Sequence, residues 1–261
     1  MLGFDKPEVV VRINSADPRW RRPSIDRTAA EAVALIGTRS ASPFDALLPE
    51  VPKGDGHAVL VLPALFRGDP YTEAVRQFLS AIGYSAHGWD LGVNIGPTKR
   101  LLDGTSSRLV ELCDEHGPVS IVGYSMGGLY ARWLSMRMPE RVRQVVTVCS
   151  PCNAPASNFW LPLEPLLGLW PDVDLASLAV EVAGPLPVPG AFIFSRDDGI
   201  VNSAACRDTH AADEDNIEIS GRHVTIARNP EVMSIVAGRL ARKPGAGGGF
   251  SDRSGRHPPA A

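Results

Sequence analysis

The sequence predicts an α/β fold in which a mostly parallel central sheet is covered by helices on both faces. Short apolar runs alternate with helical patterns from about residue 57 to residue 242. The first run, His57–Pro63, is continuously apolar, as expected for a strand buried on both faces of a parallel sheet. In addition, Gly123–Gly128 places a serine at the turn from an apolar strand pattern into a helical pattern. Ligands of such sheets bind at the carboxyl ends of the strands, so functional residues are expected there.

Residues 1–56 are predicted to form an N-terminal arm outside the main domain. Val9–Ile13 has the pattern of a short strand, and Asp26–Ile36 has an alanine-rich apolar face that is typical of a helix. Residues 37–56 contain prolines and glycines, and we expect them to connect the arm to the main domain.

The main domain is predicted to span residues 57–242, a length sufficient for one large α/β domain with a well-buried core. Its strand patterns are short and apolar, and its helical patterns repeat apolar residues at spacings of three and four. Strands are predicted at 57–63, 84–87, 118–122, 142–149, 191–195 and 216–219, and helices at 71–82, 98–115, 129–136 and about 230–242.

Two further segments do not follow this alternation. Residues 151–189 are rich in proline, leucine and tryptophan, and the part from 153 to 185 is predicted to form a cap or lid-like insertion near the mouth of the sheet. Packing over the sheet edge is the alternative role for this apolar segment. The tail, residues 243–261, is rich in glycine and proline and is predicted to be disordered.

The segment Gly123-Tyr124-Ser125-Met126-Gly127 matches the nucleophile elbow G-x-S-x-G. In this turn the serine adopts a strained backbone conformation with positive φ, and side chains at the glycine positions would collide with the strand or the helix. The serine hydroxyl is then raised at the tip of the sheet beside the free N–H groups of a helix N-terminus. We therefore predict Ser125 to be a catalytic nucleophile.

A nucleophilic serine needs a histidine base, and the base needs an orienting acid. With an elbow of this type the chain order is serine, acid, histidine. Of the six histidines, His210, His223 and His257 follow Ser125 with room for an acid between. His257 lies in the tail and His210 in a polar stretch, whereas His223 follows the last predicted strand. We therefore predict His223 as the base.

The acid is expected directly after the strand at 191–195, where Asp197 and Asp198 are adjacent. Adjacent residues at a strand end point to different sides, so only one of them can face the histidine. The residue that is not the acid would be a carboxylate that stabilises the loop, and Asp197 could do so by pairing with Arg196.

The negative charge that develops on the substrate requires an oxyanion hole. One donor is expected to be the N–H of Met126, and the second the N–H of Leu65 in the loop 63–68 that follows the first strand. Each such donor stabilises the charge by about 3 kcal/mol. Apolar residues near the mouth of the sheet are candidates for the substrate pocket: Phe66, Trp160, Trp170 and Val201.

Composition and sequence patterns indicate which partners the protein binds and in which cellular compartment it resides. The net charge is −3 and no strong basic block lies outside Arg19–Arg22, which we expect to be a solvated N-terminal segment; both features argue against nucleic acid as the main partner. No run is long enough for a transmembrane helix, and the N-terminus lacks a signal-peptide pattern, so we expect a cytoplasmic protein without integral membrane association. Cys149 and Cys152 have C-x-x-C spacing without further metal-ligand pairs, which favours reduced cysteines over a zinc site; a Cys149–Cys152 disulfide is the alternative.

From about His57 to Leu240 the chain resembles the α/β-hydrolase superfamily, and in particular its small bacterial esterase- or lipase-like members. The resemblance implies the Asp198 assignment, because the acid of this superfamily is commonly followed two or three residues on by an apolar residue of the Ile-Val type, here Ile200 and Val201. Ala64 departs from the pattern, since relatives usually carry glycine there. The matching segments are Val61–Phe66, Gly88–Asn94, Gly123–Gly128, Val145–Pro151, Asp198–Val201 and His223–Val224.

Together the residues and the resemblance predict a serine hydrolase that cleaves carboxylic esters through an acyl-enzyme on Ser125, with His223 as base and Asp198 as orienting acid. The expected substrate is a small-molecule or lipid-like ester. This chemistry implies no metal and no organic cofactor. The alternatives are an acyltransferase or thioesterase on the same fold, and a non-catalytic binding protein built on it.

Overall fold

The computed structural model describes residues 23–36, 48–153, 170 and 172–242. The predicted strand at Val9–Ile13, Trp160 and the tail 243–261 lie outside the described residues. Within the N-terminal arm, the predicted helix is present as α1 (Ile25–Ile36).

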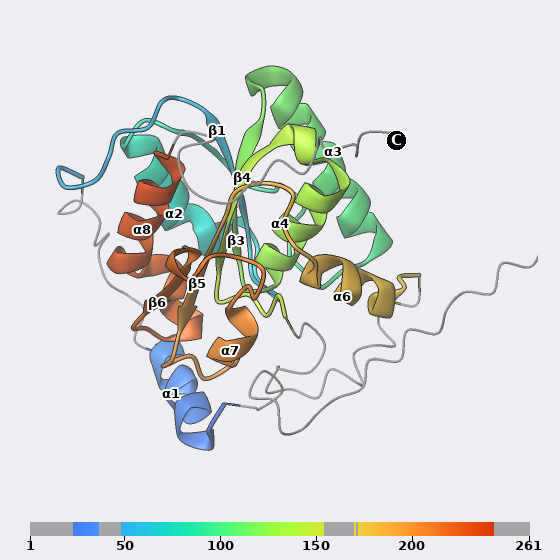
Figure 1. Ribbon diagram of the computed structural model, residues 1–261. Coiled ribbons are helices and arrows are strands. Elements are labelled where there is room, and N and C mark those ends of the chain that lie inside the picture. The colour runs from blue at the N-terminus through green and yellow to red at the C-terminus, as the bar shows by residue number, and fades with distance from the viewer. Residues whose placement is uncertain (1–22, 37–47, 154–169, 171, 243–261) are drawn as a thin grey trace, which may run out of the picture.

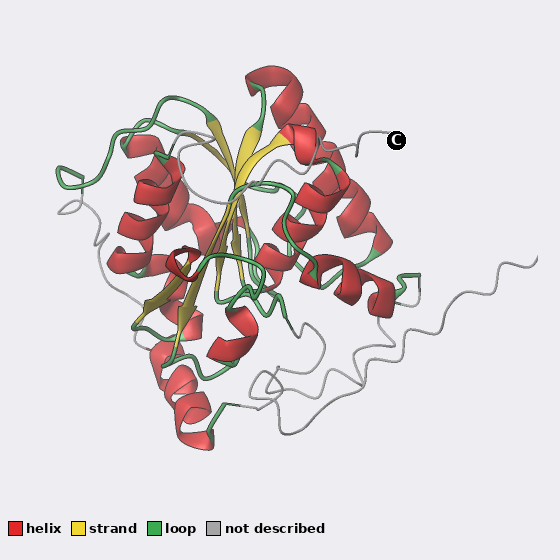
Figure 2. Ribbon diagram, in the orientation of Figure 1, coloured by secondary structure: helices red, strands yellow, loops and turns green. Residues whose placement is uncertain are grey.

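A six-stranded sheet with every neighbouring pair parallel forms the centre of the molecule (Figures 1 and 2). Its strand order is β2-β1-β3-β4-β5-β6. Because all six strands are parallel, the carboxyl ends of β3, β5 and β6 lie at the same edge of the sheet. The strands are β1 (Ala58–Leu62), β2 (Ser85–His87), β3 (Val119–Tyr124), β4 (Val142–Val148), β5 (Gly190–Ser195) and β6 (Asn216–Ile219).

Helices cover both faces of this sheet, as predicted, and in Figure 2 they lie on either side of the strands. Every helix predicted after residue 57 is present, with ends shifted by a few residues. The α-helices are α2 (Asp69–Ala81), α3 (Lys99–His116), α4 (Met126–Arg137), α6 (Leu175–Ala183), α7 (Ser203–Cys206) and α8 (Pro230–Leu240), and the short 3₁₀ helices are η2 (Pro139–Arg141), η3 (Asp213–Asp215) and η4 (His223–Arg228).

The strand residues divide into two cores because successive side chains point to opposite faces. Val59 and Val61 of β1 pack in the cluster that includes α2 and α8, whereas Leu60 and Leu62 pack in the cluster that includes α3 and α4. All five residues of β1 are buried. Burying each such side chain contributes about 2 kcal/mol, so continuous apolar strands of this kind require helices on both faces.

The described part of the predicted cap contains a helix. Within 153–185 the chain forms α6, a regular helix that the Pro/Leu/Trp-rich pattern did not predict. This helix packs against the elbow helix α4, where the buried Arg132 guanidinium donates to the carbonyls of Val182 and Gly184. The cap therefore remains a prediction: α6 packs on α4, and 154–169 and 171 lie outside the described residues.

The structure also bears on the membrane and cysteine predictions. Among the described helices, none combines the length and the apolar composition needed to cross a bilayer. All four cysteines are free, so Cys149 and Cys152 do not form a disulfide.

Candidate active site

Ser125 occupies the turn between β3 and α4 with φ 52° and ψ −118°, the strained conformation that the elbow motif predicts. Its N–H donates to the carbonyl of Val148 at 2.8 Å, which fixes the turn to the end of β4. A Cβ at position 123 would lie 2.4 Å from the carbonyl oxygen of Gly127, and one at position 127 would lie 2.3 Å from that of Leu62. Only glycine fits at both positions, because backbone atoms cannot give way.

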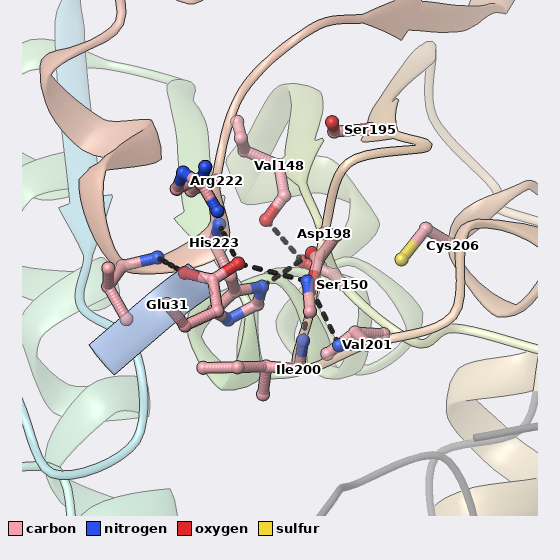
Figure 3. A network of polar contacts seen from close by, with 12 residues as sticks. Glu31, Val148, Ser150, Ser195, Asp198, Ile200, Val201, Cys206, Arg222 and His223 are labelled. Carbon is pink, nitrogen blue, oxygen red and sulfur yellow. Dashed lines mark hydrogen bonds and ion pairs between the residues drawn. The ribbon is translucent and has the colours of Figure 1, made fainter. Parts of the chain in front are cut away.

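Asp198 and His223 meet at the same edge of the sheet (Figure 3). Asp198 follows β5, His223 begins η4 after β6, and Asp198 Oδ2 lies 2.6 Å from His223 Nδ1. The other carboxylate oxygen, Oδ1, accepts the N–H groups of Ile200 at 2.8 Å and Val201 at 2.7 Å. The side chains of Asp198 and His223 are both buried, so this hydrogen bond is shielded from water.

These contacts determine the tautomer of the imidazole. An ionised carboxylate only accepts hydrogen bonds, so the short contact requires the proton on Nδ1 of His223. Nε2 is then the unprotonated nitrogen, as a general base requires. The described contacts include no hydrogen bond between Ser125 Oγ and His223; catalytic hydrogen bonds of this kind are often long before substrate binds.

The two adjacent aspartates have different environments. Asp197 is exposed and turns away from the histidine, accepting the N–H of Gly221 at 3.4 Å. The geometry thus brings Asp198, and not Asp197, to His223. The suggested pairing of Asp197 with Arg196 is wrong: Arg196 pairs with Glu218 across the β5–β6 strand pair at 2.9 Å.

The pKa of His223 reflects opposing effects. Burial alone would lower it, but the charge of Asp198, its hydrogen bond to the ring and the charge of Glu31 raise it, so the pKa lies above its usual value of 6.5. The imidazolium is therefore stabilised, as needed by a base that carries a proton between two reaction steps.

The loop predicted to complete the oxyanion hole leaves the N–H of Leu65 uncommitted. The N–H groups of Phe66 and Arg67 donate to the carbonyls of Asn94 and Ala64 at 2.7 and 3.0 Å. Within the described part of the chain, the N–H of Leu65 between Ala64 and Phe66 has no acceptor. Met126 is the first residue of α4, and the N–H of a first helical residue has no acceptor within the helix. Both predicted donors are thus available.

Asn94 is a residue of this site whose role the sequence did not reveal. It is fully buried and holds the loop by both its side chain and its backbone. Its Nδ2 donates to the carbonyl of Pro63 at 2.9 Å, and its N–H donates to the carbonyl of Arg67 at 2.8 Å. With the Phe66 bond, these contacts fix the loop from a segment about thirty residues away; no local pattern signals them.

The four residues predicted to line the substrate pocket do not lie together in the structure. Phe66 is half exposed and lines a cavity of about 560 Å³ between the oxyanion loop and the segment that follows His223. Trp170 is instead buried in the core, where its Nε1 donates to the carbonyl of Ile95. Val201 is fully buried and packs with Phe194, so neither residue lines this cavity. Trp160 lies outside the described residues.

Cys149 lies beside the candidate triad. Its Sγ, a carboxylate oxygen of Asp198 and a ring nitrogen of His223 all lie within 4.8 Å of one another. Burial raises the pKa of the Cys149 thiol, and the neighbouring Asp198 charge adds to this effect. Since both oxygens of Asp198 and Nδ1 of His223 are already hydrogen-bonded, a hydrogen-bonding network explains this group better than a metal site does.

Comparisons with known proteins were made at three levels. A family model described as "alpha/beta hydrolase fold" matches residues 107–187, which include the elbow but neither Asp198 nor His223. No curated protein matches significantly. Among solved structures, a chain described with LipS and LipT, two metagenome-derived lipolytic enzymes, is similar with a TM-score of 0.52 and 14% identity, covering 72% of this chain and 93% of that chain.

Two other structures are similar with lower scores. The thioesterase domain from the curacin biosynthetic pathway has a TM-score of 0.47 and 13% identity, covering 73% of this chain and 93% of that one. The α/β-hydrolase domain-containing protein 10 from mouse has a TM-score of 0.48 and 14% identity, covering 71% and 88% of the two chains. The sheet topology, the family match and the first structural likeness agree that this chain has the α/β-hydrolase fold.

Proposed function

We propose that the protein is a serine hydrolase that cleaves carboxylic esters through an acyl-enzyme on Ser125. The observation that carries this proposal is the hydrogen-bonded Asp198–His223 pair at the sheet edge where the elbow presents Ser125. A serine in a strained turn can occur without any catalytic role. A buried imidazole whose Nδ1 proton is fixed by a carboxylate supplies the base that a nucleophilic serine needs.

In the first half of the reaction, Ser125 Oγ attacks the ester carbonyl while its proton moves to Nε2 of His223. The carbonyl oxygen becomes an oxyanion and accepts the N–H groups of Leu65 and Met126. As the carbonyl reforms, the C–O bond to the alcohol breaks, and the imidazolium of His223 donates its proton to the leaving oxygen. Asp198 stabilises the imidazolium during this step.

In the second half, His223 takes a proton from water as the water oxygen attacks the acyl-enzyme. Collapse of the second tetrahedral intermediate returns the proton to Ser125 Oγ and releases the carboxylic acid. Each oxyanion donor is expected to contribute about 3 kcal/mol of transition-state stabilisation.

The cavity beside Phe66 is our candidate for the substrate pocket. Its volume of about 560 Å³ falls in the range of small-molecule sites. It lies between the proposed oxyanion loop and Val224, the residue after the proposed base. A small-molecule or lipid-like acyl or alcohol part of an ester could occupy this volume.

A fluorophosphonate probe tests the proposal directly, because it reacts with an activated serine and not with an ordinary one. The wild-type protein should be labelled, and Ser125→Ala should not; Ser120→Ala is the matched control because Ser120 is buried in β3. Equal labelling of wild type and Ser125→Ala would overturn the proposal and favour a binding protein.

A series of p-nitrophenyl esters of increasing acyl length then defines the substrate class. Hydrolysis with release of free acid supports the esterase activity. Transfer of the acyl group to an added alcohol or amine in preference to water would instead indicate an acyltransferase, and preference for thioesters over matched oxygen esters a thioesterase.

A further inference from the structure

Glu31, on the N-terminal helix α1, reaches the candidate triad from outside the predicted hydrolase domain. Its carboxylate is buried, with 3% of the residue exposed. Oε1 accepts the N–H of Gly199 and the N–H of His223, both at 2.9 Å, and Oε2 accepts the N–H of Val224 at 3.0 Å. Figure 3 shows this carboxylate between the helix and the two loops.

These three donors belong to the two loops that carry the acid and the base. Gly199 directly follows Asp198, and His223 is the base itself. One side chain therefore joins the acid loop to the histidine loop at the backbone level, next to the 2.6 Å contact between Asp198 and His223. Hydrogen bonds from N–H groups to a charged acceptor are roughly twice as strong as neutral ones, so this carboxylate limits movement of one loop relative to the other.

The helix α1 packs closely against the loop that follows Asp198. Thr28 Oγ1 donates to the carbonyl of Gly199 at 2.7 Å. A Cβ at position 199 would lie 2.3 Å from the carbonyl oxygen of Arg27, so a larger residue would displace the helix. The arm segment that carries Glu31 thus has a specific docking surface beside the triad.

We propose that Glu31 is a positioning residue for the Asp198–His223 pair, holding both loops in the geometry that the proposed ester hydrolysis requires. The inference rests on the proposed function. Glu31 does not touch the substrate; it acts through the backbone of Gly199, His223 and Val224.

Glu31 also adds negative charge near the imidazole. The ionisable groups around His223 come from several elements: Asp198 after β5, Glu31 on α1, Cys149 after β4, and Tyr71 of α2, which interacts electrostatically with Asp198 and Cys149. Cys149 and Tyr71 are neutral near pH 7 because burial raises the pKa of each. Removing the charge of Glu31 should therefore lower the pKa of His223, an effect that a purely structural role would not produce.

The test compares Glu31→Gln and Glu31→Ala with wild type. The second-order rate of fluorophosphonate labelling is measured across a pH series, and the imidazole of His223 is titrated by NMR. Glu31→Ala should lower the plateau labelling rate by about 100-fold, because the loops lose their common acceptor. Glu31→Gln keeps an acceptor for two of the three N–H groups, and should lower it by about tenfold. Both variants should shift the titration of His223 and the acid limb of labelling to lower pH.

Asp26→Asn is the matched control, because Asp26 is an exposed carboxylate on the same helix. It should label and titrate as wild type does. A folded Glu31→Gln variant with wild-type rate and unchanged His223 titration would overturn the proposal, as would an equal shift in Asp26→Asn.

Two further measurements distinguish failure of the proposed function from failure of the role proposed for Glu31. If wild type labels no faster than Ser125→Ala, the proposed function fails, while the NMR titration of His223 still decides the role of Glu31. If the Glu31 variants do not fold, amide exchange in the wild-type protein replaces them. The amides of Gly199, His223 and Val224 should exchange slowly, and rapid exchange would contradict the bracing role.

Discussion

Replacement of Asp198 by asparagine should nearly abolish activity without unfolding the protein. Asp198 Oδ1 accepts two backbone N–H groups, from Ile200 and Val201. In Asp198→Asn the amide oxygen should keep this position, because an NH₂ group there would face two donors. The amide NH₂ is then turned toward Nδ1 of His223, which can accept its hydrogen bond only if the ring proton moves to Nε2.

This change of tautomer removes the base. An imidazole with its proton on Nε2 cannot take the proton of Ser125, even though every heavy atom keeps its place. A change of this type in another serine hydrolase lowers kcat by about 10⁴-fold, which corresponds to about 5.5 kcal/mol of transition-state stabilisation. We expect a loss of similar size here.

The assay is steady-state hydrolysis of a p-nitrophenyl ester together with fluorophosphonate labelling and thermal unfolding. Asp197→Asn is the matched control, since Asp197 is the exposed neighbour and makes a 3.4 Å contact with Gly221 N–H. It should retain activity within a few-fold of wild type. The reasoning is refuted if Asp197→Asn loses activity while Asp198→Asn keeps it, or if folded Asp198→Asn remains fully active.

Three further predictions follow from other contacts. The kcat/KM of ester hydrolysis should rise with pH and level off only above pH 6.5, because the neutral imidazole is the base and the pKa of His223 is raised; a plateau reached below that pH would contradict it. Arg132→Met leaves the buried Asp208 carboxylate without its 2.6 Å partner and should lower the free energy of unfolding by about 3–5 kcal/mol. Calorimetry should show a fall in Tm of roughly 6–20 °C, and an unchanged Tm would refute this. Asn94→Ala should lower kcat by about tenfold with a smaller change in KM, because it loosens an oxyanion donor; an effect on KM alone would argue against that role.

The raised pKa of His223 also has a consequence for stability. A group whose pKa is higher in the folded than in the unfolded state contributes stability that is fully present below the unfolded value, near 6.5. This contribution is lost as the pH rises through the folded pKa. The stabilising contribution of His223 is therefore largest at low pH, where the imidazole is protonated and the proposed activity is low. It decreases as the pH rises and the neutral imidazole forms.

The amino end of the sheet holds a second aspartate–histidine–serine chain. His57 Nδ1 is hydrogen-bonded to Asp55, and its Nε2 lies 2.8 Å from Ser120 Oγ. Ser120 is fully buried within β3, and Asp55 also pairs with Arg143 at 2.8 Å. A serine inside a strand has no access to substrate and no free helix N–H groups beside it. This group ties β1 to β3, and its serine, unlike Ser125, lies within a strand and not at a strand-to-helix turn.

Much of the fold could be predicted because its signals are local. A strand buried on both faces must be apolar throughout, so β1 is recognisable from His57–Pro63 alone. The helix α6 was missed because prolines and tryptophans before it mask a short apolar helix whose partner, Arg132 of α4, lies more than forty residues earlier. Its own pattern is helical, since Leu175, Leu178 and Val182 share the face that packs on the core, and Arg132 binds the carbonyls at its end.

By itself, the sequence predicted the elbow at Ser125 and the order in which the proposed acid and base follow it. The elbow is recognisable because its strained turn requires glycines at fixed neighbouring positions. The tertiary structure decided which of two adjacent aspartates faces His223, and it alone brought Glu31 to the backbone of His223 across 192 residues. Hydrogen bonds between such distant segments depend on how the whole chain packs. No pattern within either segment can specify them.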